Sequence, residues 1–148
     1  MTNLLLFSSS IFSTIVHYIG FFKYNPNYSF LEYSYISGLV TSIINHGFSH
    51  NFFKILDRAT ITTLFFINLY LINKIYKLTK NKYIIENTFI LMIMSVFMFF
   101  LTKLIDIEKN KKIKYIPHMI AHILATISNI ILIQEYSKFN KKLNIKRS

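Results

Sequence analysis

Residues 4–22 read LLLFSSSIFSTIVHYIGFF, a stretch without a charged side chain, and stretches of this kind decide the fold of the chain. A helix needs about 20 mostly apolar residues to cross a bilayer. Such windows recur along the sequence, and together with their interfacial flanks they predict spans near residues 4–22, 32–48, 59–76, 86–103 and 116–134. The apolar runs do not alternate with polar residues as strands do, so we expect an all-α, multi-pass transmembrane helical bundle of about five spans.

The composition of the 148 residues favours a membrane protein over other classes. Hydrophobic residues make up 53% of the chain and charged residues 16%, whereas soluble domains carry about 25% charged residues. The chain therefore has too few charged side chains to cover a water-facing surface, and it is too apolar for intrinsic disorder. It has no cysteine, so a disulfide framework is excluded and a metal site has to use histidine and carboxylate ligands.

We expect one transmembrane domain over residues 1–148 with a basic C-terminal tail over residues 135–148. The first window lacks the basic start and the small-residue cleavage site of a signal peptide, so we expect it to be a retained span. The charged stretches between windows, such as 49–58 and 103–115, are predicted to be loops.

The net charge of +11 indicates the membrane rather than nucleic acid as the partner. The lysines lie between apolar runs, where the loops that flank membrane spans are expected to be basic, and no basic stripe is interleaved with exposed aromatic residues. We therefore expect an integral membrane protein that contacts membrane lipids and binds no nucleic acid. Ten Lys and Arg residues fall on the C-terminal side of the predicted topology and seven on the other side, which favours a cytosolic C-terminus.

Polar and ionisable residues at membrane depth are costly and point to function. Ser42 and His46 lie four residues apart in the second window, and His118 and His122 lie four apart at the start of the fifth. Each pair therefore shares one helical face, and two imidazoles at this spacing can converge on one metal ion. Pro117 is expected in the first turn of the fifth helix, where its missing N–H costs nothing.

The predicted topology brings these residues to one side of the membrane. The second span ends and the fifth begins on the N-terminal side, and Asp57 precedes the third span there. Three histidines with an open fourth position, here His46, His118 and His122, are typical of catalytic Zn²⁺, which lowers the pKa of its bound water toward ~7. Asp57 is the candidate that takes up the remaining proton, and Ser42 is the candidate that either stabilises the developing oxyanion or orients the water.

The segments SIINHGFSHNFFKILD (42–57) and HMIAHILA (118–125) together resemble the signature of the alkaline ceramidase-like membrane hydrolase superfamily. That superfamily includes the alkaline ceramidases, the adiponectin and progestin receptors and the lipases that remodel GPI anchors. The resemblance implies that His46, His118 and His122 bind Zn²⁺. It also implies that Asp57 positions a water molecule and that Ser42 polarises the scissile carbonyl of a lipid amide or ester. Members of the superfamily typically have seven spans, so this chain is expected to be a shortened member that lacks two helices of the pocket wall.

Three functions stay open on the sequence. The favoured one is a zinc-dependent intramembrane hydrolase that attacks a lipid amide or ester with zinc-activated water. The second is a catalytically inactive, receptor-like or scaffold membrane protein, with or without a zinc site, which the two absent helices favour. In the third, the histidine spacing is accidental, and the imidazoles only form hydrogen bonds between neighbouring helices.

Overall fold

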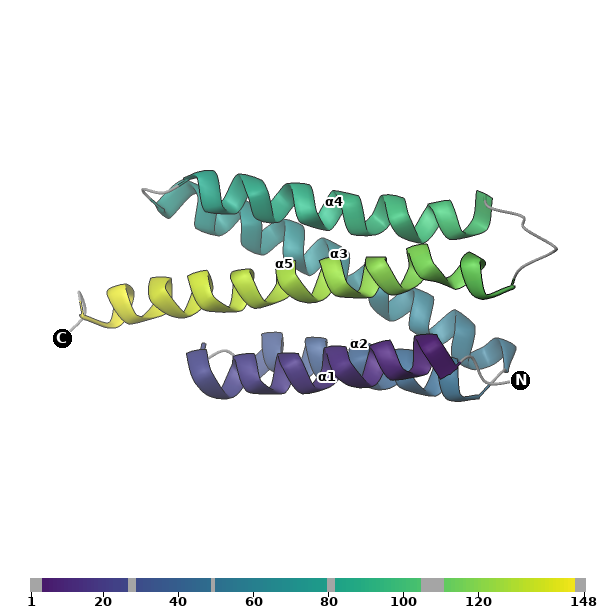
Figure 1. Cartoon of the computed structure of the whole chain (residues 1–148). Helices are drawn as coiled ribbons and strands as arrows, with labels where there is room; N and C mark the ends of the chain where they lie inside the picture. Colours follow the sequence, from purple (N-terminus) through teal and green to yellow (C-terminus); the bar gives the residue numbers. More distant parts are fainter. Residues whose placement is uncertain (1–3, 27–28, 49, 80–81, 105–110, 146–148) are drawn as a thin grey trace.

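The computed structural model of the chain describes residues 4–26, 29–48, 50–79, 82–104 and 111–145, and these residues form five α-helices and no strand. The helices are α1 (Leu4–Tyr24), α2 (Ser29–Gly47), α3 (Asn51–Leu78), α4 (Lys82–Leu104) and α5 (Lys111–Ile145). Successive helices run in opposite directions, so the two termini lie at opposite ends of an elongated bundle (Figure 1). The predicted all-α bundle is confirmed.

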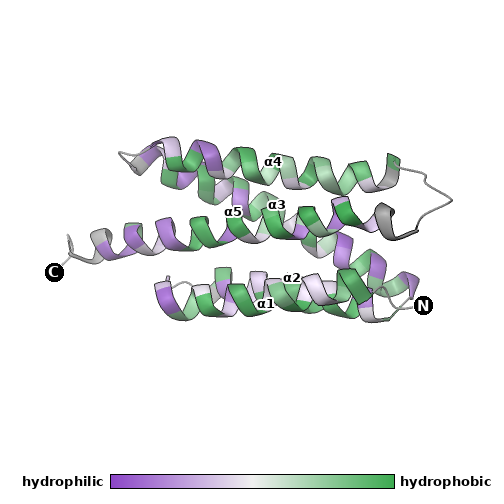
Figure 2. Cartoon of the chain, in the orientation of Figure 1, coloured by the Kyte–Doolittle hydropathy of each residue, from purple (hydrophilic) through white to green (hydrophobic). Residues whose placement is uncertain are grey.

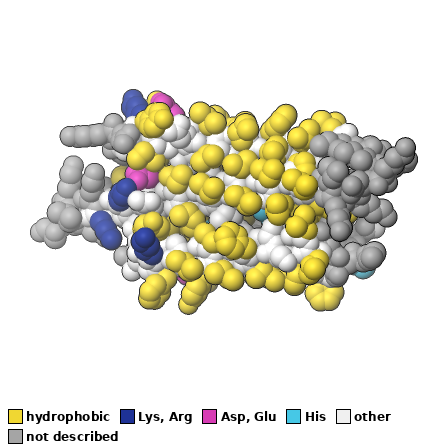
Figure 3. Space-filling view, viewed as in Figure 1, with side chains coloured by type: hydrophobic (Ala, Val, Ile, Leu, Met, Phe, Trp, Pro, Cys, Tyr) yellow, Lys and Arg dark blue, Asp and Glu magenta, His cyan; other side chains and the backbone are white. Residues whose placement is uncertain are grey.

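Four helical segments are long and apolar enough to cross a membrane, namely Leu4–Tyr24, Asn51–Lys77, Lys82–Thr102 and Tyr115–Lys141. Figure 2 shows that α4 is apolar along most of its length, whereas α5 becomes polar toward the C-terminus. Hydrophobic side chains cover the visible face, and lysines and carboxylates gather at the end that carries the C-terminus (Figure 3). The molecule is therefore built as a multi-pass membrane protein. The predicted span 32–48 is helical, but it is not among the four because α2 carries many hydroxyl, amide and ionisable side chains.

The third helix begins earlier than the sequence predicts. A loop is expected over residues 49–58, yet α3 starts at Asn51, so the loop prediction is wrong for 51–58 and Asp57 lies inside the helix. Residue 49 lies outside the described residues. The cause is His50, whose backbone is extended (φ −112°, ψ 136°) and whose Nδ1 accepts a hydrogen bond from the N–H of Phe52 at 3.2 Å. This contact satisfies one of the free N–H groups of the first turn and lets the helix begin there.

The fifth helix also begins earlier than expected. It starts at Lys111, so Pro117 lies inside the helix and the prediction that it occupies the first turn is wrong. Pro117 has no N–H to donate to the carbonyl four residues before it, and the helix continues past that missing bond. Residues 105–110 of the predicted loop 103–115 lie outside the described residues.

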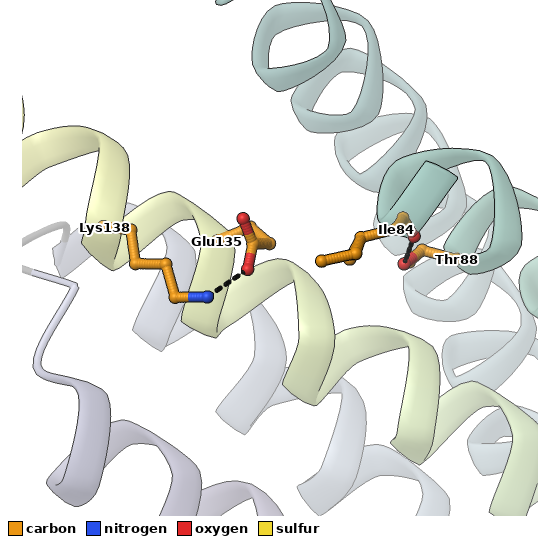
Figure 4. Close-up of polar contacts among 4 residues, drawn as sticks. All are labelled: Ile84, Thr88, Glu135 and Lys138. Carbon is orange, nitrogen blue, oxygen red and sulfur yellow. Dashed lines mark hydrogen bonds and ion pairs between the residues drawn. The ribbon is translucent and has the colours of Figure 1, made fainter. Parts of the chain in front are cut away.

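Helix α5 is the centre of the bundle and continues well past the apolar region. It packs against α1, α3 and α4. At its polar end Lys138 Nζ donates to Glu135 Oε1 at 2.6 Å within the helix, while on α4 the buried Thr88 hydroxyl donates to the Ile84 carbonyl at 2.7 Å (Figure 4). Both contacts satisfy polar groups within a single helix, so neither sets how helices pack together.

The apolar core lies in the half of the bundle toward the C-terminal end of α5. It is made by large side chains from all five helices that are almost completely buried: Phe21, Leu31, Tyr35, Leu71, Ile75, Ile85, Leu132, Ile133 and Tyr136. The polar residues that the sequence singles out lie on α2, α3 and the first half of α5, in the other half of the bundle. The apolar core and the candidate site thus lie at different positions along the length of the bundle.

Helix α5 also holds the turn between α1 and α2. Asn25 adopts a positive φ of 40°, which ends α1 ahead of Pro26. The Ser137 hydroxyl donates to the carbonyl of Tyr24, and Asn140 Nδ2 donates to the Pro26 carbonyl at 2.7 Å. These bonds satisfy carbonyls at the end of α1 that have no partner within their own helix.

Helices α2 and α3 approach closely at Gly38. A Cβ atom at this position would overlap Leu64 Cδ1 and would lie 3.8 Å from Thr60 Cγ2. Small residues allow close packing of membrane helices. We expect Gly38→Val to force the two helices apart and to lower the free energy of unfolding by about 1–3 kcal/mol, measured by thermal unfolding in detergent. Ser37→Val, at an exposed neighbouring position, should change it little, and equal stability of the two variants would contradict the prediction.

Candidate metal centre

Three histidines from two distant parts of the sequence meet near one end of the bundle. His46 lies in the last turn of α2, and His118 and His122 lie on one face near the start of α5. One ring nitrogen of each histidine lies within 4.8 Å of the corresponding atoms of the other two. The ring centroids are 5.2 Å apart for His46 and His118, 5.4 Å for His46 and His122, and 5.0 Å for His118 and His122. The structure thus brings together the three histidines that the sequence predicts as ligands.

The imidazoles bridge a gap between two helices that do not pack directly. Within the described ranges no Cα atom of α2 lies within 8 Å of a Cα atom of α5. A tetrahedral ion with metal–nitrogen bonds of about 2.0–2.1 Å holds its ligand nitrogens roughly 3.4 Å apart. The three ligand nitrogens lie within 4.8 Å of one another, so they have to move closer together to bind one ion at these bond lengths.

Two serines on α1 contact Nδ1 of His122 and indicate which nitrogen carries the proton. Ser9 and Ser10 each donate their hydroxyl proton to the Leu6 carbonyl, at 2.8 and 3.0 Å. Their oxygens lie 3.5 and 3.4 Å from His122 Nδ1 and can only accept from it, because a carbonyl has no proton to return. Nδ1 of His122 therefore carries the proton, and its Nε2 keeps the lone pair that a metal requires, an arrangement typical of metal-binding histidines.

The other two rings differ in their surroundings. His46 is 9% exposed, and its Nε2 is buried without a hydrogen-bond partner. A buried nitrogen of this kind is costly unless it is satisfied, and a metal ion would satisfy it. The His118 ring packs edge-on against Phe99 of α4, with centroids 5.1 Å apart and planes at 85°. The donor set and its geometry thus fit a metal ion with three nitrogen ligands.

Asp57 is buried on α3 but is not a member of the histidine group. It is 5% exposed, its Oδ2 accepts a hydrogen bond from Asn45 Nδ2 at 2.7 Å, and its Oδ1 is buried without a partner. Asn45 immediately precedes His46, so this bond ties the carboxylate to the end of α2 that carries the ligand. The structure therefore places Asp57 as a neighbour of the ligand-bearing turn rather than as a ligand.

Ser42 is linked to the centre through α1. It is 8% exposed, and its Oγ lies 3.1 Å from Ser10 Oγ, which in turn contacts His122 at 3.4 Å. Because the Ser10 proton is used on a carbonyl, Ser42 is the donor in this contact. His50, four residues after His46, caps α3 through its Nδ1 and is not a member of the histidine group.

Ser9, Ser10 and Asn45 contact residues of this centre but were not predicted from the sequence. The available signals were the three consecutive serines in an otherwise apolar window and the amide beside His46. Neither signal identifies a partner, because serine commonly packs between membrane helices without a functional role.

Comparison with protein-family models finds no match to this chain, and comparisons with curated proteins and with solved structures find none either. Fold and site together define the class of the molecule, which is a multi-pass helical membrane protein with three histidines placed to hold a metal ion.

The first test of the centre is its metal content. We expect protein purified in detergent without chelator to carry about one divalent metal ion per chain, and His46→Ala, His118→Ala or His122→Ala to lose it, measured by elemental analysis. His50→Ala is the matched control, because this imidazole lies on the same stretch of chain but caps α3, and it should retain the metal. Metal-free, folded wild-type protein would contradict the assignment.

Proposed function

We propose that this chain is a zinc-dependent intramembrane hydrolase that cleaves an amide or ester bond in a membrane lipid. The observation that carries the proposal is the convergence of His46 with His118 and His122, whose ring nitrogens lie within 4.8 Å of one another although 72 residues separate the first two. Three imidazoles without a fourth protein ligand are the donor set of a catalytic zinc site. When bound, Zn²⁺ supplies a Lewis acid and a nucleophilic hydroxide at neutral pH.

The chain's own residues supply the remaining functions. Asp57 uses Oδ1 to take up the proton of the attacking water, since this oxygen is buried and unpartnered while Asn45 holds Oδ2 in place. Ser42 lies one turn before His46 and turns its hydroxyl from Ser10 to the carbonyl oxygen of the substrate. The substrate is a lipid because the surrounding helices expose hydrophobic side chains along most of their length.

The same residues carry the resemblance to the alkaline ceramidase-like superfamily, and the proposal includes membership as a shortened relative. The motif residues Ser42, His46, Asp57, His118 and His122 all lie in the described part of the chain and are all at least half-buried. This supports the family's division of roles, in which three histidines bind the ion while an aspartate and a serine act on water and carbonyl.

A second candidate is a catalytically inactive, receptor-like or scaffold membrane protein that retains the zinc site. The observation that favours this candidate is that neither of two surface hollows leads to the three histidines. A groove of about 880 Å³ between α1 and α2 is lined by Thr14, His17 and Glu32 among others, and a hollow of about 380 Å³ lies beside Phe30 and Phe66. None of the three metal-site histidines lines either of them, whereas a hydrolase has to admit a lipid carbonyl to its ion.

Replacement of Asp57 distinguishes catalysis from metal binding. We expect Asp57→Asn to lower turnover of fluorescent lipid amides or esters in mixed micelles by about 10²–10⁴-fold, the usual contribution of a positioned proton acceptor, with unchanged zinc content. Glu86→Gln is the control: this exposed carboxylate accepts a hydrogen bond from the Tyr76 hydroxyl at 3.1 Å, and its loss should leave turnover intact.

Two outcomes would overturn the hydrolase proposal. Full turnover by Asp57→Asn would remove the role assigned to the carboxylate. Wild-type protein that holds stoichiometric zinc but cleaves none of a panel of lipid amides and esters would favour the inactive, receptor-like candidate.

A further inference from the structure

A second set of polar side chains crosses the bundle interior beyond the metal centre. His17, Tyr35, Asn68 and Asn129 come from α1, α2, α3 and α5 respectively, and we call them the second polar layer. His17, Tyr35 and Asn68 are 2%, 1% and 5% exposed, and Asn129 is half-buried. The proposed hydrolysis uses none of these residues, although buried polar groups in a membrane are costly.

The four side chains form one hydrogen-bonded chain whose direction is determined. His17 Nδ1 lies 2.7 Å from the Ser13 carbonyl and has to donate to it. His17 Nε2 then accepts from Asn129 Nδ2 at 3.1 Å, and Asn129 Oδ1 accepts from Asn68 Nδ2 at 2.8 Å. The Tyr35 hydroxyl completes the chain by donating to Asn68 Oδ1. Each of the four side chains is thus paired with a side chain on another helix, so displacement of any one helix breaks at least one of these bonds.

On each helix, the residue of the second polar layer lies on the same face as a residue of the metal centre. Each member is seven or eleven residues from a residue of the centre on the same helix, which is about two or three turns and therefore the same face. These pairs are Ser10 and His17 on α1, Ser42 and Tyr35 on α2, Asp57 and Asn68 on α3, and His122 and Asn129 on α5.

A bridge between the layer and the centre joins α1 to α5. Thr126 Oγ1 donates to the His122 carbonyl at 2.7 Å, and Ser13 Oγ lies 2.6 Å from Thr126 Oγ1 and donates to it. Ser13 and Thr126 lie between the two sets of residues along their helices. The register of α1 against α5 is thus specified from the second polar layer up to His122.

We propose that the second polar layer consists of positioning residues that hold four helices in the register at which His46, His118 and His122 converge on one ion. Apolar side chains in lipid specify register weakly, because lipid tails are as apolar as they are. A slip of one residue turns a helix face by about 100° and leaves the imidazole and both amides of the layer unpaired. The inference rests on the metal site of the proposed function but does not require turnover of any lipid.

Asn129→Leu tests the role, because it removes the central link of the layer at nearly constant volume. We expect the affinity for Co²⁺, used as a spectroscopic probe, to fall about tenfold, within the range seen when residues that support metal ligands are lost, and the visible absorption band of the ion to change. Ser128→Ala is the matched control, since Ser128 is 1% exposed beside Asn129 but its hydroxyl donates only to the Ala125 carbonyl of its own helix. It should keep wild-type affinity and spectrum.

The positioning role can also be tested with a milder variant and with a measurement that does not involve a metal. Tyr35→Phe removes only the terminal hydroxyl and should shift affinity and spectrum in the same direction by a smaller factor. The chain has no cysteine, so Ser13→Cys with Thr126→Cys provides a single pair whose oxidation rate reports the α1–α5 register. Adding Asn129→Leu should slow that oxidation, and adding Ser128→Ala should not.

The possible failures are distinguishable. Wild-type protein that binds no metal would overturn the proposed function, while the oxidation rates would still report on register. Wild-type Co²⁺ affinity and spectrum in both Asn129→Leu and Tyr35→Phe would overturn the positioning role, as would an oxidation rate that Asn129→Leu leaves unchanged.

Discussion

The free energy of leaving a polar group unpaired in lipid is the constraint on which this structure depends. Threonine and serine hydroxyls along the helices donate to carbonyls three or four residues earlier, as Thr62 does to Arg58 and Thr102 to Met98. Larger polar side chains find partners on other helices. Among the buried side-chain atoms of the described residues, only His46 Nε2 and Asp57 Oδ1 have no partner, and both lie at or beside the candidate metal centre. Within the described part of the chain, the unpaired buried side-chain atoms thus lie where a ligand and a water molecule would supply the missing contacts.

Helix α5 connects the parts of the molecule that have to cooperate. Its first half carries two of the three imidazoles, its middle carries Asn129 of the second polar layer, and its last turns hold the α1–α2 connection through Ser137 and Asn140. The apolar core surrounds its C-terminal half. The apolar core and two of the three clustered histidines therefore lie on different segments of one helix.

Metal geometry and substrate access are separate properties of this bundle. The three imidazoles are arranged by α2 and α5, whose backbones stay apart and leave room between them for the rings. A groove of about 880 Å³ lies instead between α1 and α2, with His17 of the second polar layer in its wall. An enzyme and an inactive relative can share the first property and differ in the second, which is why turnover rather than metal content separates the two candidate functions.

The sequence by itself determined the fold class and which three histidines come together. Long charge-free runs have to be helices in lipid, and a four-residue spacing together with alternating helix direction places His46 near His118 and His122. It did not determine where the helices begin, because the cap at His50 depends on one local hydrogen bond and α5 continues through Pro117 despite a missing one. Nor did it reveal that Asp57 lies within α3 or that Ser10, Asn45 and the second polar layer support the centre. Only the tertiary structure decided these points, since a helix that is apolar on all sides carries no periodicity that specifies its rotation or its neighbours.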